Sequence, residues 1–151
     1  MKALVPYLLL SLACLLAQAQ AQERAAATPL PPAAVTNLQP RRIIRAELLR
    51  AMLQRTNDFV LIDVSPALYY RDFHIQGAMS IPEPDLPQAV RDWPRNRRIV
   101  VYCLDEACES GRDATRTLMT LGFTDVLQYE GGKRDWHRKK YEAIGPGKLL
   151  D

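Results

Sequence analysis

Short apolar runs recur along the chain with the length and composition of buried β-strands. They cover residues 60–64, 99–103 and 126–129, and a shorter run lies at 78–81. Only Asp63 interrupts the run at 60–64. Such a run of β-branched and other apolar residues is typical of a strand that is buried on both faces, as in parallel sheets. These runs therefore predict the strands of a parallel sheet.

Segments that suit helices alternate with these runs. They are 43–55, 66–73, 82–94, the stretch that ends at Gly122, and 132–143. The first begins at Ile43 and Ile44, and Gly145-Pro146-Gly147 stops the last. Because strand and helix alternate, we predict an α/β domain with a mostly parallel central sheet and helices on both faces.

The first 40 residues lie outside this pattern. Residues 1–21 combine Lys2, an apolar run over 4–16 and two overlapping Ala-Gln-Ala cleavage sites, which is typical of a signal peptide. A membrane anchor is the alternative, but the run is shorter than the roughly 20 residues that span a bilayer. We therefore expect an exported protein, either periplasmic or secreted. Residues 22–40 are rich in Ala, Pro and Gln and predict a flexible arm.

Cys14 adds a second alternative at the N-terminus. Leu12-Ala13-Cys14 resembles the end of a lipobox, where a lipid on the cysteine tethers an exported protein to a membrane. Ser11 stands where that pattern usually has an aliphatic residue. A membrane tether is therefore expected only if Cys14 is lipidated, and the mass of the mature N-terminus would distinguish the two cases.

Length and composition indicate one ordinary globular domain. The chain has 151 residues, of which 48% are hydrophobic and 25% charged, and single domains typically hold about 100–150 residues. We expect the domain over 41–145 and a tail over 146–151.

The formal charge of +3 is too small to indicate nucleic-acid binding, which export also disfavours. Two basic clusters are expected to be solvated faces. They are Lys133, Arg134, Arg138, Lys139 and Lys140, and Arg91, Arg95, Arg97 and Arg98.

Candidate chemistry concentrates where the run at 99–103 ends in Cys103. A cysteine that closes a buried strand lies at the carboxyl end of the sheet, where open α/β folds bind ligands. The helix that follows turns unpaired N–H groups toward this edge, and such groups bind anions and favour a thiolate. A plain buried cysteine is the alternative interpretation.

Two groups of motifs resemble the signatures of the rhodanese-like family. The first is Val60-Leu61-Ile62-Asp63-Val64, followed by His74-Ile75-Gln76-Gly77-Ala78 and Ile81-Pro82. The second is Val100-Val101-Tyr102-Cys103, followed by Leu118-x-x-x-Gly122-Phe123-x-x-Val126 and Gly131-Gly132-x-x-x-Trp136. They stand in the family's order and separation, and the resemblance covers roughly residues 43–142.

The resemblance implies a sulfurtransferase that needs no cofactor. Cys103 would take sulfane sulfur from a small sulfur-containing anion such as thiosulfate, or from a persulfide donor. It would hold this sulfur as a persulfide and pass it to a thiol acceptor or a redox protein. The loop after Cys103 would cradle the negative charge with its amides. The candidate substrate-binding residues are Leu104, Asp105, Glu106, Ala107, Glu109 and Arg112.

The loop departs from the family pattern in length and charge. It is two residues longer than usual, and Glu106 stands where a glycine is common. Asp105, Glu106 and Glu109 are expected to raise the pKa of the Cys103 thiol and to repel thiosulfate. Arg112 either offsets this charge or pairs with Glu109 at the helix surface. It is nine residues after Cys103, so the Cys-x5-Arg spacing of rhodanese-fold phosphatases is missing.

Asp63 and His74 have supporting roles in the resemblance. The family's aspartate organises loops, and its histidine packs under the turn that leads to Gly77. In this chain Ser65 replaces the arginine that usually follows Asp-Val. We therefore expect Asp63 to lack its usual charge partner.

Cys108 allows three interpretations of the loop. Apart from Cys14, Cys103 and Cys108 are the only cysteines in the sequence. The oxidising compartment of an exported protein allows them to form a disulfide. A curled loop can bring their Cα atoms within the roughly 4.4–6.8 Å that a disulfide needs. Cys-x4-Cys loops also occur in exported proteins that resemble this family. Cys108 is then a resolving thiol for Cys103, half of a thiol–disulfide carrier, or half of a structural bridge in a catalytically silent binding module.

Zinc binding is a further interpretation of the same cysteines. His74 and His137 would have to complete the site, but zinc motifs usually place cysteines two to four residues apart and histidines in a matching pair. We therefore expect no metal, a structural role for His74 and a solvated position for His137.

Overall fold

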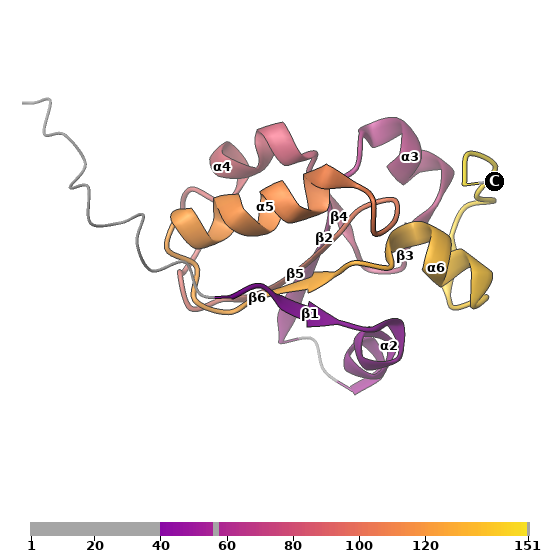
Figure 1. The fold of residues 1–151 in the computed structure, drawn as a ribbon, viewed down its shortest axis with the longest axis horizontal. Helices are drawn as coiled ribbons and strands as arrows, with labels where there is room; N and C mark the ends of the chain where they lie inside the picture. Colours follow the sequence, from indigo (N-terminus) through magenta and orange to yellow (C-terminus); the bar gives the residue numbers. More distant parts are fainter. Residues whose placement is uncertain (1–39, 56–57, 151) are drawn as a thin grey trace, which may run out of the picture. The chain divides into compact units, whose positions relative to one another are not determined.

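The sheet contains five strands: β1 (Arg42–Ile44), β2 (Phe59–Asp63), β4 (Met79–Ser80), β5 (Arg98–Tyr102) and β6 (Val126–Tyr129). They lie in the spatial order β1-β6-β5-β2-β4, and all neighbours are parallel (Figure 1). This computed structural model describes residues 40–55 and 58–150. The central strand β5 is apolar throughout after its first residue and is buried on both faces, as the unbroken run predicted.

Helices cover both faces of this sheet, which confirms the predicted α/β architecture. On one face α4 (Leu86–Ala89) and α5 (Glu109–Thr120) bury an apolar cluster with Ile62, Val101 and Cys103. On the other face α2 (Ala46–Arg55) and α6 (Gly132–Arg138) bury Leu49 and Trp136 against the opposite sides of the strands. Figure 1 shows α4 and α5 on one side of the sheet and α2 on the other.

The remaining elements are short. They are α3 (Ala67–Asp72), β3 (His74–Ile75), the 3-10 helix η2 (Glu83–Asp85) and β7 (Ala143–Ile144). β3 and β7 form a separate two-stranded antiparallel sheet. The predicted signal peptide (1–21), Cys14 and the arm (22–40, apart from Pro40) lie outside the described residues. In the part of the chain that is described, no helix has the length and hydrophobicity needed to cross a membrane.

Three predicted helices are shorter than expected. Ile44 belongs to β1, because residues 42–44 pair with 127–129 of β6, and α2 begins only at Ala46. The segment 82–94 is divided into η2 and α4, since its prolines remove backbone donors from a longer helix. The terminal helix ends at Arg138, before Lys140 takes a left-handed φ of 54°, and the chain then enters β7.

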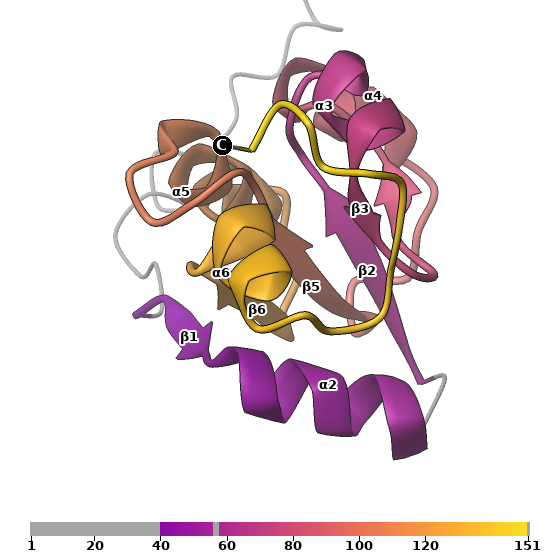
Figure 2. The ribbon, with the colours of Figure 1, turned by 90° about the vertical axis from the view of Figure 1, so that its right-hand side faces the viewer.

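The predicted tail is packed against the domain over its described residues. The amide of Gly147 donates to the carbonyl oxygen of Asp72 (3.2 Å), and the amides of Lys148 and Leu149 donate to the Asp72 carboxylate (3.0 and 2.9 Å). Leu150 is buried in the same apolar cluster as Trp136. In Figure 2 this segment passes α3 and then runs back toward α6, where the Leu150 carbonyl oxygen accepts from Arg134 (3.1 Å). The folded unit therefore extends to Leu150, beyond the predicted boundary at 145.

Asp125 joins three strand ends through two arginines. Its carboxylate accepts from Arg42 of β1 (2.6 Å) and from Arg98 of β5 (2.7 Å), just before β6 begins. Burial alone would raise the pKa of Asp125, but the hydrogen bonds from Arg98 and Arg42 outweigh burial and hold its pKa below the ordinary value of 3.8. The stabilisation is thus complete above about pH 4 and is lost as the pH falls through the lower, folded-state pKa.

Replacing Asp125 with asparagine should therefore reduce the acid sensitivity of the fold. We expect Asp125→Asn to lower the free energy of unfolding by about 1 kcal/mol at pH 7 and by much less near pH 2. Urea unfolding followed by circular dichroism across this pH range measures the effect. Asp92→Asn is the control, because the Asp92 side chain is 82% exposed. Equal acid sensitivity in wild type and Asp125→Asn would contradict the assignment.

Candidate active site: the Cys103–Cys108 loop

The register of the central strands brings the candidate residues to one edge of the sheet. Asp63, the last residue of β2, pairs in register with Tyr102, the last residue of β5. Cys103 follows at once and is 3% exposed, with its side chain in the apolar cluster beneath α4 and α5. The sulfur-bearing residue therefore stands at the carboxyl edge, where the sequence predicted it, but it is covered rather than open.

A disulfide closes the loop. Cys103 and Cys108 are bonded with their Cα atoms 6.2 Å apart. Cys108 is the residue immediately before α5 and is partly exposed. The pairing considered from the sequence is therefore present, and the structure shows the oxidised form of the loop.

Two loop amides are satisfied inside the loop. The amide of Ala107 donates to the Asp105 carboxylate (3.0 Å), and the amide of Cys108 donates to the Asp105 carbonyl oxygen (3.2 Å). These amides are therefore engaged with Asp105 while the disulfide is closed. The expected anion cradle is not assembled from them in this form.

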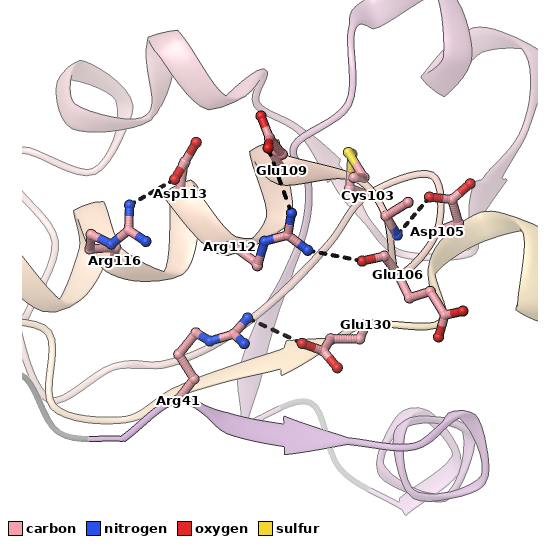
Figure 3. Close-up of polar contacts among 11 residues, drawn as sticks. Arg41, Cys103, Asp105, Glu106, Glu109, Arg112, Asp113, Arg116 and Glu130 are labelled. Carbon is pink, nitrogen blue, oxygen red and sulfur yellow. Dashed lines mark hydrogen bonds and ion pairs between the residues drawn. A yellow bond between two sulfur atoms is a disulfide. The ribbon is translucent and has the colours of Figure 1, made fainter.

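Arg112 acts on the loop from the first turns of α5 (Figure 3). It donates to the carbonyl oxygen of Glu106 (3.1 Å) and lies 3.9 Å from the carboxylate of Glu109. The pairing with Glu109 agrees with one of the two alternatives for this residue, and the contact with Glu106 adds a brace across the loop. Arg112 thus holds the loop backbone as well as a neighbouring charge.

Asp105 has a cationic partner that the sequence did not suggest. Arg134 of α6 donates to the Asp105 carboxylate at 2.8 Å. The predicted crowding of three carboxylates is therefore reduced to Glu106 and Glu109, whose side chains face solvent.

Asp63 also has a cationic partner, which corrects the expectation from the loss of arginine at position 65. Lys133 Nζ lies 2.8 Å from Asp63 Oδ2, and both side chains are 0% exposed. Ser65 donates its amide (3.0 Å) and its hydroxyl (2.6 Å) to Asp63 Oδ1. Lys133 is therefore not part of a solvated basic face. Burial lowers the pKa of Lys133, while the attraction of Asp63 opposes this effect.

The start of α6 holds the first residues of the loop. The amides of Lys133 and Arg134 donate to the carbonyl oxygens of Cys103 and Leu104, each at 3.0 Å. Gly132 makes this approach possible with a left-handed φ of 61°. A Cβ at Gly132 would lie 2.6 Å from the Cys103 carbonyl oxygen, which is closer than Cβ atoms approach other heavy atoms in proteins.

His74 supports the turn after α3. Its ring stacks on Tyr70 with centroids 3.9 Å apart, and Nδ1 is 2.8 Å from the Tyr70 carbonyl oxygen. The next amide, that of Ile75, donates to the buried Tyr102 hydroxyl (3.1 Å). Desolvation and the nearby Asp63 carboxylate raise the pKa of Tyr102 well above its ordinary value. The contacts of His74 are structural.

His137 packs edge-on against Phe73, so it is not simply solvated. Among residues 40–55 and 58–150, no three His, Cys, Asp or Glu side chains gather in a way that could hold a metal ion. The disulfide uses both cysteine sulfurs that the zinc interpretation required.

A cavity of about 530 Å³ adjoins the outer side of the loop. It lies between the loop, the turn from β1 into α2 and the turn from β6 into α6, and its lining includes Glu47, Glu106, Ala107, Tyr129 and Arg138. The turns at the carboxyl ends of parallel strands form such crevices. Space for a molecule that approaches the loop is therefore available on this side.

Comparisons with known proteins identify the relatives of this arrangement. Residues 45–139 match the model of the rhodanese-like domain family. A sulfurtransferase from Allochromatium vinosum is 28% identical over 103 residues, which cover 68% of this chain and 94% of that protein. The HTH-type transcriptional regulator Rv0324 of Mycobacterium tuberculosis is 34% identical over 94 residues, or 62% of this chain, and the match spans only 40% of the regulator's length.

Solved structures of similar proteins support the same family. The Alr3790 protein from Anabaena superposes with a TM-score of 0.62 at 29% identity, over 68% of this chain and 80% of that one. The solution structure of a rhodanese-like domain from the same protein gives a TM-score of 0.62 at 27% identity, over 75% and 84% of the two chains. With its family signatures, its parallel sheet and a cysteine at the carboxyl end of the central strand, the chain belongs to the rhodanese-like family.

Proposed function

We propose that this protein is an exported sulfurtransferase that carries sulfane sulfur on Cys103 and uses Cys108 as a resolving thiol. The proposal rests chiefly on one observation, which is that Cys103 stands at the carboxyl end of β5 and is bonded to Cys108. The similarity to a sulfurtransferase from Allochromatium vinosum supports the reaction class. The apolar run and cleavage sites in residues 1–21 support export.

The cycle begins with reduction, because the disulfide occupies the Cys103 sulfur. Two electrons from a thiol reductant open the bond and release both cysteines. The Cys103 thiolate then attacks the outer sulfur of thiosulfate, so that a new S–S bond forms and sulfite leaves with the electron pair of the broken bond. The result is a persulfide on Cys103.

The persulfide can be discharged in two ways. A thiol acceptor attacks its outer sulfur, which becomes the acceptor's persulfide while Cys103 leaves as a thiolate. Alternatively, Cys108 attacks the inner sulfur, on Cys103, and expels hydrosulfide as the disulfide closes. The second route returns the protein to the form seen in the structure.

A thiol–disulfide carrier is the second candidate function, and the closed Cys103–Cys108 bond is the observation that favours it. A carrier would cycle between dithiol and disulfide without a persulfide. Formation of sulfite from thiosulfate therefore separates the two candidates.

The test compares reduced wild type with single-cysteine variants in thiosulfate and either cyanide or a thiol acceptor. We expect Cys103→Ser to reduce sulfite release to the uncatalysed background. Cys108→Ser should retain release and should lose the requirement for prior reduction, because no disulfide can form. Redox cycling that needs both cysteines without sulfite release would instead indicate a carrier. Activity unaffected by Cys103→Ser, or none in any variant, would contradict sulfur transfer and favour a binding module.

A further inference from the structure

The two cysteines of the disulfide differ in how far they are exposed. Cys103 is 3% exposed and belongs to the apolar cluster of α4, α5 and the strands. Cys108 packs at the edge of the same cluster but remains partly exposed at the start of α5. In the oxidised form, a reagent from solvent therefore meets Cys108 before it meets Cys103.

The cover over Cys103 comes from three directions. Gly111, in the first turn of α5, lies so close that a Cβ there would be 3.5 Å from Cys103 Cβ. The amide of Lys133 at the start of α6 donates to the Cys103 carbonyl oxygen. Below, Ile62 and Val101 share its apolar cluster. Cys103 is thus held by the sheet and by two helices, whereas Cys108 is held by the loop and one helix end.

We propose that a reducing thiol attacks the disulfide at Cys108, so that Cys103 is the leaving group. The proposal deepens the sulfurtransferase function and rests on it. Thiol–disulfide exchange depends on access to the sulfur that is attacked, and the structure leaves only Cys108 partly exposed. The thiolate of the reductant forms a bond to Cys108 Sγ, the Cys103–Cys108 bond breaks, and its electron pair stays on Cys103.

This direction of attack yields the reactive form of Cys103 in one step. Cys103 emerges as a thiolate while Cys108 carries the reductant in a mixed disulfide. A second thiol then attacks the reductant's sulfur, leaves as a disulfide with it, and frees Cys108. Two thiols are oxidised and the protein disulfide is reduced, so the electrons balance.

The charges around Cys108 determine which thiols are favoured. Glu106 and Glu109 carry exposed carboxylates on either side of it, and the Glu109 side chain is 85% exposed. Among the described residues, Arg112 is the cation that contacts these two glutamates: it donates to the Glu106 carbonyl oxygen and lies 3.9 Å from the Glu109 carboxylate. Two carboxylates against one guanidinium leave a net negative charge. The structure thus points to neutral or cationic thiols, such as a protein dithiol with a basic rim, as the preferred reductant.

The position of attack can be mapped directly. Oxidised wild type is exposed briefly to 2-mercaptoethanol, the reaction is stopped with acid, and free thiols are capped with N-ethylmaleimide. Cleavage at Glu106 separates the two cysteines for mass spectrometry. We expect the mercaptoethanol adduct on Cys108 and the maleimide on Cys103, in at least ten-fold excess over the reverse pattern. An adduct mainly on Cys103 would overturn the proposal.

The charge preference has its own readout. At equal thiolate concentration and low salt, cysteamine should open the disulfide about five to ten times faster than mercaptopropionate. The double variant Glu106→Gln/Glu109→Gln should reduce this ratio to about one or below it, and an unchanged ratio would contradict the role of these carboxylates. The experiments contain no thiosulfate. Failure of the mapping therefore leaves sulfite release untouched, and absence of sulfite release leaves the mapping result intact.

Discussion

Replacing Lys133 with methionine is expected to lower the free energy of unfolding by about 3 to 5 kcal/mol. Lys133 and Asp63 form an ion pair in which both side chains are fully buried. Removal of the ammonium leaves the Asp63 carboxylate in a site that water does not reach, with Ser65 as its remaining hydrogen-bond donor on Oδ1. Denaturant unfolding of wild type and Lys133→Met measures the loss.

A second substitution tests whether the unpaired charge is the cause. Asp63→Asn/Lys133→Met removes both charges and keeps an oxygen for the two Ser65 donors, so it should recover most of the lost stability. Arg138→Met is the matched control on α6, since the Arg138 side chain is 77% exposed, and it should change stability by less than about 0.5 kcal/mol. If Asp63→Asn/Lys133→Met were as unstable as Lys133→Met, the loss of stability would not come from the unpaired charge on Asp63, and Lys133 would stabilise the fold in another way.

The strands and the cysteine were predictable because each depends on local sequence. Residues 60–64, apart from Asp63, and 99–103 are apolar runs of strand length, and such runs are typical of strands that are buried on both faces. A cysteine at the end of one of them must lie at the carboxyl edge of a parallel sheet. The position of Cys103 therefore follows from its place in the chain.

The partners of the acidic residues were not predictable in this way, because they come from a distant segment. Lys133 and Arg134 look like members of a basic surface run in the sequence, yet they pair with Asp63 and Asp105. One signal was available. Lys133 precedes the buried Trp136 by three positions, which places both on the same side of a helix. A buried aspartate without a nearby cation also requires one from elsewhere in the fold.

The ends of the helices were also not predictable from the sequence pattern, because tertiary contacts determine them. Ile44 fits the helical spacing of the following segment, but its backbone is used by β6. Ala143 fits the terminal helix, but it pairs with Ile75 instead. In both cases strand pairing satisfies backbone groups that a longer helix would have satisfied, and apolar spacing does not distinguish the two outcomes.

Replacing Gly132 with alanine is expected to disturb both the fold and the loop. The backbone there has a φ of 61°, which costs an L-residue about 1 to 2 kcal/mol. The added Cβ would also lie 2.6 Å from the Cys103 carbonyl oxygen and 2.7 Å from the Leu104 carbonyl group. We expect Gly132→Ala to lower the free energy of unfolding by about 2 to 4 kcal/mol, because backbone strain and steric overlap add.

Gly122→Ala separates these two causes. Gly122 has a φ of 89°, but a Cβ there would have nothing within 4 Å, so this variant carries the backbone strain alone. It should lose about 1 to 2 kcal/mol and keep the wild-type rate of sulfite release. Gly132→Ala should release sulfite at least ten times more slowly, even where it is fully folded, because the Cys103 carbonyl must move away from the Lys133 amide. Equal activity in the two variants would show that the start of α6 supports the loop without controlling the reactivity of Cys103.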